Sequence, residues 1–176
     1  AADFTALSGS VTIPANTSSA VVDLSILTDV LVEADETVIV TLSAVTAGDA
    51  AIAVDTDNDE ATITIPDNDN ALVSIAASDD VVDETGTNNG VYTVTLSNQS
   101  SSATTVSYAV AGTAASAADF TALSGSVTIP ANTSSAVIDL AILTDVLVEA
   151  DETVIVTLSA VTAGDAAIAV DTDNDE

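Results

Sequence analysis

The chain has 176 residues, of which 28 are acidic and none is lysine, arginine or histidine, so its formal net charge is −28. A protein without basic side chains cannot neutralise phosphate groups, which makes nucleic acids and anionic membrane surfaces very poor partners. The absence of cysteine excludes disulfide bonds and thiolate metal sites, and the absence of an 18-residue apolar run argues against a membrane span.

Segments rich in Val, Ile and Thr follow one another along the chain with turn-forming residues between them. They predict strands at 61–65, 71–78, 91–97, 104–110, 124–130, 134–143, 152–159 and 166–171. Apolar and polar residues alternate within several of them, as in 104–110, where Val106, Tyr108 and Val110 share one face. No segment shows the periodicity of an amphipathic helix.

Strands at intervals of roughly 8–15 residues indicate an all-β protein, an immunoglobulin-like antiparallel β-sandwich. The alternation predicts which side chains of these strands face the core. The expected inward-facing residues are Val94, Leu96, Val106, Tyr108, Val127, Ile129, Ile138, Leu140, Ile142, Val154, Val156 and Leu158.

The chain repeats itself, because residues 1–60 return at 117–176 with a constant offset of 116 residues. Only two positions differ, Val22 against Ile138 and Ser25 against Ala141. A period of this length is sufficient for one domain with its own core, so we expect a tandem array of whole domains.

We place the domain boundary at Ala71, where the first strand of a repeat begins. Residues 1–70 are then the C-terminal part of one repeat, and residues 71–176 are the next repeat without its last strand. A half sandwich leaves backbone groups and apolar faces open. We therefore expect another segment, from a preceding repeat or from a neighbouring chain by strand donation, to complete residues 1–70.

The stretch ILTDVLVEADETVIVTLS occurs at 26–43 and again at 142–159, and its centre is a cluster of carboxylates. Ca²⁺ takes six to eight oxygen ligands, several of them carboxylates on short loops. Alternate connections of a sandwich meet at the same end, so this loop can converge with the acids that follow the last strand. The candidate ligands on this argument are Asp145, Glu149, Asp151 and Glu152, together with Asp67 and Asp69.

Carboxylates held within about 5 Å of one another repel by a few kcal/mol at an effective dielectric constant near 20, and a divalent cation reverses the sign. The alternative is an acidic, solvated surface that keeps the protein soluble.

Two further acidic groups are weaker candidates. Asp55, Asp57 and Asp59 have the spacing that opens an EF-hand loop, but Glu60 and Pro66 stand where that motif needs Gly and Glu. This segment either holds a cation in a hairpin loop or is a polar turn. The second group, Asp79, Asp80 and Asp83, follows the repeat junction and could share an ion with Asp67 and Asp69.

The segment SGSVTIPANTSSAVIDLAILTDVLVEADETVIVTLS, preceded by Ala-Asp-Phe, and the closing ATITIPDND together resemble the Calx-beta domain family. The resemblance covers the whole period and implies a seven-stranded sandwich with Ca²⁺ at one end in some members. The family occurs in the regulatory region of the sodium–calcium exchanger, in integrin β4, and in tandem in very large bacterial surface proteins. The near-identical copies look most like the last group.

The resemblance also implies calcium ligands at defined positions. They are Glu84, Asp119 and its counterpart Asp3, Asp145, Glu149 and Glu152 with their counterparts Asp29, Glu33 and Glu36, and the closing Asp67 and Asp69. The chain departs from the family pattern at Thr144 and Thr28, which replace the first Asp of the usual pair, and in its Asp-Asn-Asp closing triplet. Each departure removes a carboxylate.

Catalysis has little support, because no His, Cys or Lys is present to act as base or nucleophile. We expect a non-enzymatic, calcium-stiffened structural repeat of an extracellular filament or adhesin stalk, secreted to the cell surface. Its partners would be neighbouring repeats of the same chain or identical chains. The alternatives are a calcium-sensing regulatory module and an accessory module of a secreted, acidic, halophilic enzyme.

Overall fold

A computed structural model describes residues 2–85 and 88–176, and the chain forms two compact units, residues 1–30 and residues 31–176. Within the described residues the regular elements are all strands, which confirms the all-β prediction. No helix in this part of the chain has the length and apolar character needed to cross a membrane.

The larger unit contains every strand of the described residues. They are β1 (Glu36–Thr41), β2 (Glu60–Ile65), β3 (Ala71–Asp79), β4 (Gly90–Leu96), β5 (Thr104–Gly112), β6 (Ser126–Ile129), β7 (Ser135–Leu140), β8 (Val154–Ala163) and β9 (Ile168–Val170). Each strand predicted from the sequence is present, with ends shifted by a few residues.

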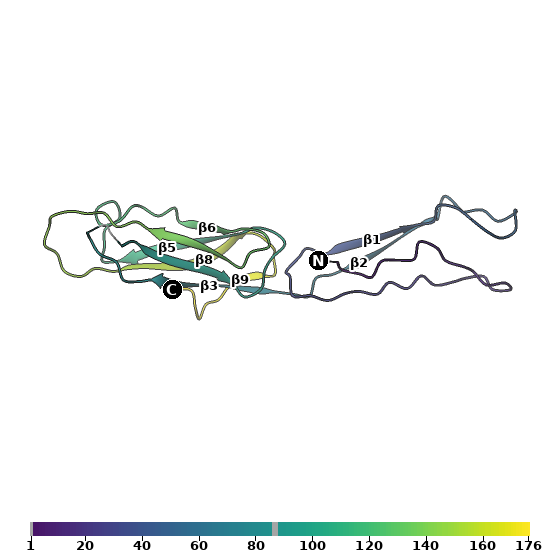
Figure 1. The fold of residues 1–176 in the computed structure, drawn as a ribbon, viewed down its shortest axis with the longest axis horizontal. Helices are drawn as coiled ribbons and strands as arrows, with labels where there is room; N and C mark the ends of the chain where they lie inside the picture. Colours follow the sequence, from purple (N-terminus) through teal and green to yellow (C-terminus); the bar gives the residue numbers. More distant parts are fainter. Residues whose placement is uncertain (1, 86–87) are drawn as a thin grey trace. The chain divides into compact units, whose positions relative to one another are not determined.

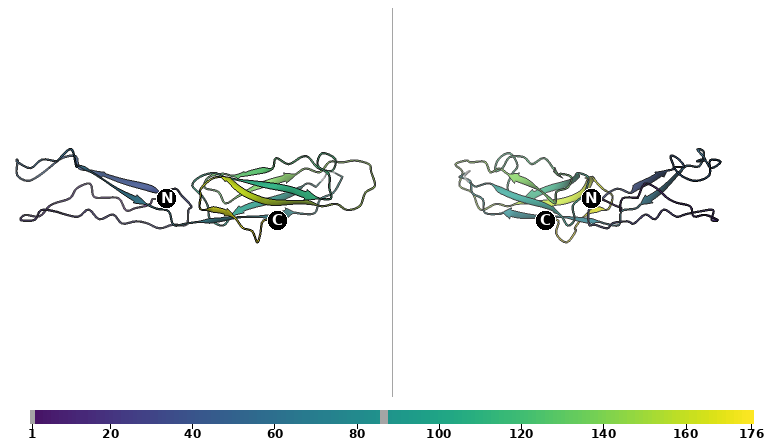
Figure 2. Two further views of the ribbon diagram at one scale, coloured as in Figure 1. Left: turned by 180° about the vertical axis from the view of Figure 1, so that it is seen from behind. Right: turned by 45° about the vertical axis from the view of Figure 1, so that its right-hand side comes forward.

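Residues 71–176 form a β-sandwich of two sheets, with strand orders β7-β4-β3-β9 and β6-β5-β8 (Figure 1). The two further views in Figure 2 show the same strands from behind and from one side. Neighbouring strands are antiparallel except β3 and β9, which pair in parallel with Ala71 opposite Ile168. The sandwich is confirmed, but it is mixed, because the chain crosses from β8 in one sheet to β9 in the other.

The core lies between these two sheets. All twelve residues predicted to face inward are buried or half-buried, and Val94, Val106 and Ile129 are completely inaccessible. Val110 differs from the prediction, since 40% of it is exposed. The last four residues of β5 are all exposed, so the alternation holds only where the strand is covered.

The first copy of the repeat has a different structure despite its near-identical sequence. In the larger unit, β1 and β2 pair as an antiparallel ladder with Glu36 opposite Ile65. The described residues of the smaller unit contain an isolated bridge between Phe4 and Ile26 in place of strands. In the second copy, β6 pairs with β5 and β7 pairs with β4. Residues 1–30 correspond to residues 117–146, which contain β6 and β7 but neither β4 nor β5, so the pairing partners have no counterpart in this unit.

Candidate metal centre

A cavity of about 560 Å³ lies at the end of the sandwich where β3 ends and β8 begins. Apolar side chains such as Phe120, Leu140 and Ile142 form part of its wall, and eight acidic residues form most of the rest. These acids are Asp79, Asp80, Asp83, Glu84, Asp119, Glu149, Asp151 and Glu152.

Asp119 is held at the cavity by the residues on either side of it. Phe120, which is 2% exposed, forms a bridge with Ile142. The Leu143 N–H donates to the Asp119 carbonyl oxygen at 2.8 Å, and the Ala115 N–H donates to the Asp119 carboxylate. The carboxylate is therefore half-buried and fixed beside the segment that leads into the acidic loop.

The acidic loop ends at Thr153, which hydrogen bonds attach to the end of β5. The Thr153 N–H donates to Thr113 Oγ1 at 2.9 Å, and the Thr153 carbonyl accepts N–H donors from Thr113 at 3.0 Å and Ala114 at 3.2 Å. At the other end of the loop, the Leu147 N–H donates to Asp145 Oδ1 at 2.7 Å. The contacts of Thr153 anchor the C-terminal end of the loop, whereas the bond between Leu147 and Asp145 is a turn within it. The loop contributes Glu149, Asp151 and Glu152 to the cavity wall.

The acids of this cavity are close enough to influence one another. Partial dehydration, followed by repulsion from Asp145, Asp119 and Glu84, raises the pKa of Glu149. The pKa of Glu152 is also raised, first by dehydration and then by repulsion from Asp119 and a hydrogen bond with it. Repulsion from Glu149 and Glu84 adds to this shift. Among the described residues of 71–176, no three acids bring ligand oxygens within 4.8 Å of one another, so the carboxylates surround the cavity without meeting at one point.

The first copy shows how the closing acids join the acidic loop. The Glu33 N–H donates to Asp67 Oδ2 at 3.0 Å, and the Asp69 N–H donates to Asp67 Oδ1 at 3.2 Å. The Asp67 N–H in turn donates to Asp35 Oδ1 at 3.2 Å. The loop before β1 and the turn after β2 therefore converge, as expected for the two ends of a common site. Glu36 is exposed at the start of β1.

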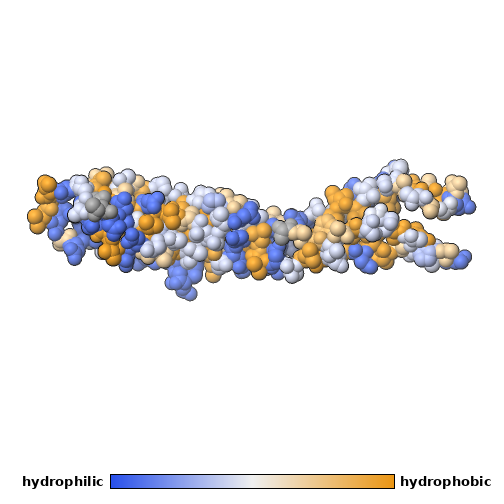
Figure 3. All heavy atoms as spheres, viewed as in Figure 1, coloured by the Kyte–Doolittle hydropathy of each residue, from blue (hydrophilic) through white to orange (hydrophobic). Residues whose placement is uncertain are grey.

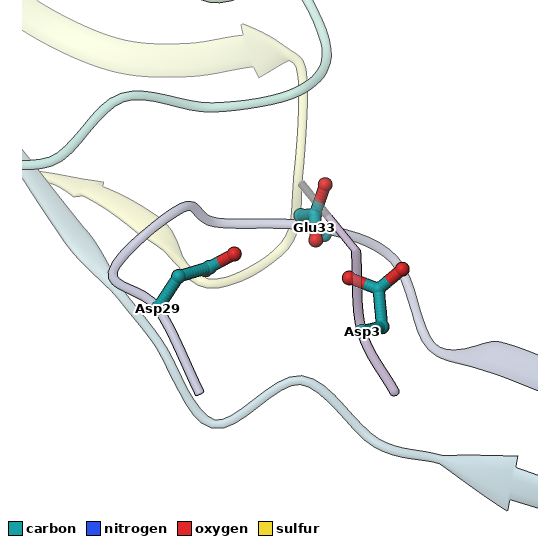
Figure 4. Close-up of side chains that lie close together, drawn as sticks. All are labelled: Asp3, Asp29 and Glu33. Carbon is teal, nitrogen blue, oxygen red and sulfur yellow. The ribbon is translucent and has the colours of Figure 1, made fainter. Parts of the chain in front are cut away.

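In the smaller unit, Asp3 and Asp29 have ligand oxygens within 4.8 Å of each other. The Leu27 N–H donates to the Asp3 carbonyl at 2.8 Å, which reproduces the contact of Leu143 with Asp119 in the second copy. Figure 4 draws these two side chains with Glu33, which follows Asp29 by four residues and belongs to the larger unit.

The two weaker candidates have different outcomes. At 55–58, Asp55 accepts hydrogen bonds from Asn58 Nδ2 at 2.9 Å and from the Asp57 N–H at 3.2 Å, and these bonds lower the pKa of its carboxyl group. This segment has the geometry of a self-capped polar turn.

The proposed sharing of an ion between Asp79, Asp80, Asp83 and the closing acids Asp67 and Asp69 is wrong. Asp79 lies at the far end of β3 from Ala71, about 26 Å away at about 3.3 Å per residue. Asp79, Asp80 and Asp83 instead line the cavity with Glu84 and Asp119. The sequence prediction placed these three acids near the start of the repeat, beside Asp67 and Asp69. The predicted strand 71–78 already separates them from that end by its own length. The sequence prediction also left out Asp35, whose counterpart Asp151 was included.

The charged ligands available at this site are all carboxylate oxygens, because the chain contains no imidazole or thiolate. Such a donor set suits a hard cation such as Ca²⁺ and not the transition metals that prefer nitrogen or sulfur. No protein cation balances these charges, so the residues present fit a calcium site.

Comparison with known families agrees with a tandem repeat of β-sandwich domains. The model of the Calx-beta domain matches residues 1–69 and again residues 67–175. Comparisons with curated proteins and with solved structures gave no match.

Proposed function

Because the chain belongs to the Calx-beta domain family, in two adjacent copies, we propose that it is a calcium-stiffened structural repeat of an extracellular filament or adhesin stalk. Calx-beta domains are non-catalytic, calcium-related structural or regulatory modules. The structural role, the extracellular location and the filament are the parts that we propose.

The observation that carries the proposal is the eight-acid cavity in a chain without basic residues. Ionising all of these carboxylates costs free energy in the folded state, and the raised pKa values of Glu149 and Glu152 express that cost. A bound divalent cation would turn this repulsion into attraction. Calcium would therefore stabilise the repeat at the end where the next one follows.

The two copies together indicate the ligands of one complete site. One repeat would supply Glu84, Asp119, Asp145, Glu149, Asp151 and Glu152, and the offset of 116 residues adds the counterparts of Asp67 and Asp69 from its closing turn. When bound, the ion supplies positive charge and fixes the geometry of flexible loops. The hydrogen bond from the Glu33 N–H to Asp67 Oδ2 holds the closing turn beside the acidic loop, which is the approach that such a site requires.

A structural role is favoured over a sensor by the near-identity of the copies, which differ at two of 60 aligned positions. A spacer needs length, and identical units provide it, whereas a sensor needs divergent domains and a coupled partner. The partners would be neighbouring repeats of the same chain or identical chains. The calcium-sensing module and the accessory module of a secreted enzyme remain the alternatives, and the architecture of the full-length protein discriminates among them.

Thermal unfolding with calcium and with EGTA, at fixed ionic strength, tests the calcium site. The chain should be extended by ATITIPDNDN, which supplies the second copy with the counterpart of 61–70. Binding stabilises the folded state by about 2.7 kcal/mol at a hundredfold excess of calcium over Kd, so we expect a clearly higher Tm with calcium.

Two variants make this experiment specific. The double change Asp145→Ala and Glu149→Ala should remove most of the calcium effect. Asp139→Ala removes an exposed acid of β7 outside the cavity and should preserve the effect. Equal melting temperatures with calcium and with EGTA for the unsubstituted chain would refute the calcium site and leave the acids as a solubilising surface.

A further inference from the structure

One valine of the first copy is buried in the sandwich of the second. Val32, in the acidic loop before β1, is 0% exposed and belongs to the same core cluster as Ala71, Val73 and Ile168. Its counterpart Val148, 116 residues later, is 101% exposed. The two side chains occupy the same place in the same sequence, DVLVEAD, so the sequence around them does not explain the difference.

Backbone hydrogen bonds fix Val32 in this position. Its N–H donates to the Gln99 carbonyl at 2.9 Å, and its carbonyl accepts the Ser101 N–H at 3.0 Å. These bonds form a parallel bridge between Val32 and Ser100, and Ser100 is itself 1% exposed. Val32 therefore pairs with the loop between β4 and β5, the receiving loop, in the way that a short additional strand would.

The segment that carries Val32 is also attached to its own repeat. The Glu33 N–H donates to Asp67 Oδ2, in the turn that closes the first repeat. Asn98 Nδ2 donates to the Asn70 carbonyl at 2.8 Å, so the receiving loop also contacts the chain at the junction. The acidic loop thus joins the end of one repeat to the base of the next through contacts on both sides.

The second copy presents the same segment without a receiving loop. Val146, Leu147 and Val148 are 97%, 65% and 101% exposed, which is unusual for three consecutive large apolar residues. In Figure 3 the tip of this loop, at the left end of the view, is coloured as hydrophobic. Exposing such an apolar tip to water is unfavourable in free energy unless another surface covers it, even in a chain with a net charge of −28.

We propose that Leu147 and Val148 form a docking element whose occupant is the base of another copy of this repeat, with Val148 inserted beside the residue equivalent to Ser100. The contacts of Val32 show that the base of a repeat accepts this sequence. The receiving loop NQSSSA carries no charge, so an apolar segment can approach it without meeting a carboxylate. This docking makes successive repeats continuous through their apolar cores, and it requires neither calcium nor an extracellular filament.

The absence of cysteine from the chain allows a direct test by thiol labelling. Val32→Cys and Val148→Cys are prepared in the 176-residue chain and in a chain extended at its C terminus by a copy of residues 61–176. That extension places a repeat after Val148 in the register that residues 71–176 have after Val32. Cysteine is a small, readily buried side chain, so the exchange is mild.

In the 176-residue chain, Val32→Cys should react with a maleimide about 10- to 100-fold more slowly than Val148→Cys, the population factor expected for one buried valine side chain. In the extended chain, Val148→Cys should slow to the rate of Val32→Cys. Val146→Cys is the control and should stay fast in both chains, because its counterpart Val30 is 66% exposed. Unchanged rapid labelling of Val148→Cys in the extended chain would overturn the proposal.

Amide hydrogen exchange of the unsubstituted chains gives a second readout that does not depend on how a cysteine variant folds. The Val148 N–H should exchange quickly in the 176-residue chain and become protected in the extended one, and exchange that stays fast would also overturn the proposal. Both measurements are made with calcium and with EGTA. Protection in both conditions supports docking even if calcium leaves the Tm unchanged, so failure of the calcium proposal and failure of the docking proposal give different results.

Discussion

At the level of single residues, the two glutamates with raised pKa values give the candidate calcium site a characteristic pH dependence. A carboxyl group whose pKa is higher in the folded state than in the unfolded state favours folding while it is protonated. Its contribution is complete below the unfolded value, near 4.5, and is lost as the pH rises through the raised pKa of Glu149 and Glu152. Bound calcium would reverse this dependence, because protons would compete with the ion for the same oxygens.

We therefore expect opposite slopes of Tm against pH in the window just above 4.5. With EGTA the Tm should fall as the pH rises, and with saturating calcium it should rise. Glu149→Gln combined with Glu152→Gln should flatten both curves. Hydrogen bonds from the Asn58 side chain and the Asp57 N–H lower the pKa of Asp55, so this group does not contribute in this window. A Tm that rises with pH in EGTA would contradict this account of the cavity.

Gly112 is the second residue with a specific role, because it ends β5 where the acidic loop is attached. Its φ is +119°, and a Cβ atom there would lie 2.0 Å from the Thr153 carbonyl oxygen. Gly112→Ala should lower the free energy of unfolding by at least about 2 kcal/mol. The matched control is Gly125→Ala, at φ +79° with no atom within 4 Å of the added Cβ, which should cost about 1 kcal/mol of strain alone. Urea unfolding followed by tyrosine fluorescence measures both, and equal costs would contradict the clash.

At the level of elements, the repeat offers an internal comparison of one segment in two environments. SVTI forms β6 in the second copy, where Ile129 is 0% exposed, and forms no strand in the first, where Ile13 is 56% exposed. β6 is stable because β5 provides its ladder and the opposite sheet covers Ile129. Strand propensity alone does not supply either of these.

Ile129→Ala should therefore destabilise the sandwich by about 2–5 kcal/mol, whereas Ile13→Ala should change its stability by less than about 0.5 kcal/mol. Both tyrosines of the chain, Tyr92 and Tyr108, lie in the sandwich, so tyrosine fluorescence during urea unfolding reports on this domain selectively. Equal effects of the two substitutions would mean that the two copies have the same packing.

At the level of the whole molecule, the first copy exposes apolar residues that the second copy buries. Val22 is 45% exposed and its counterpart Ile138 is 6% exposed, and Leu42 and Leu158 differ in the same way, at 50% and 3%. We expect that a copy of residues 71–116 placed ahead of Ala1 supplies the strands corresponding to β3, β4 and β5. Amides at 10–13 and 19–24, the counterparts of β6 and β7, should then become protected from hydrogen exchange. Unchanged exchange would argue against the boundary at Ala71, which stays a prediction.

The sequence by itself determined the repeat, the sandwich class, the inward face of β4 to β8 and most of the acids of the candidate site. These properties depend on period-2 alternation and on residue identity, both of which are local and readable. The tertiary structure decided the parallel pairing of β3 with β9, the position of Asp79 at the cavity and the burial of Val32. Burial and pairing depend on which segment lies opposite, and identical stretches such as those around Val32 and Val148 differ in their burial because only one of them has the next repeat against it.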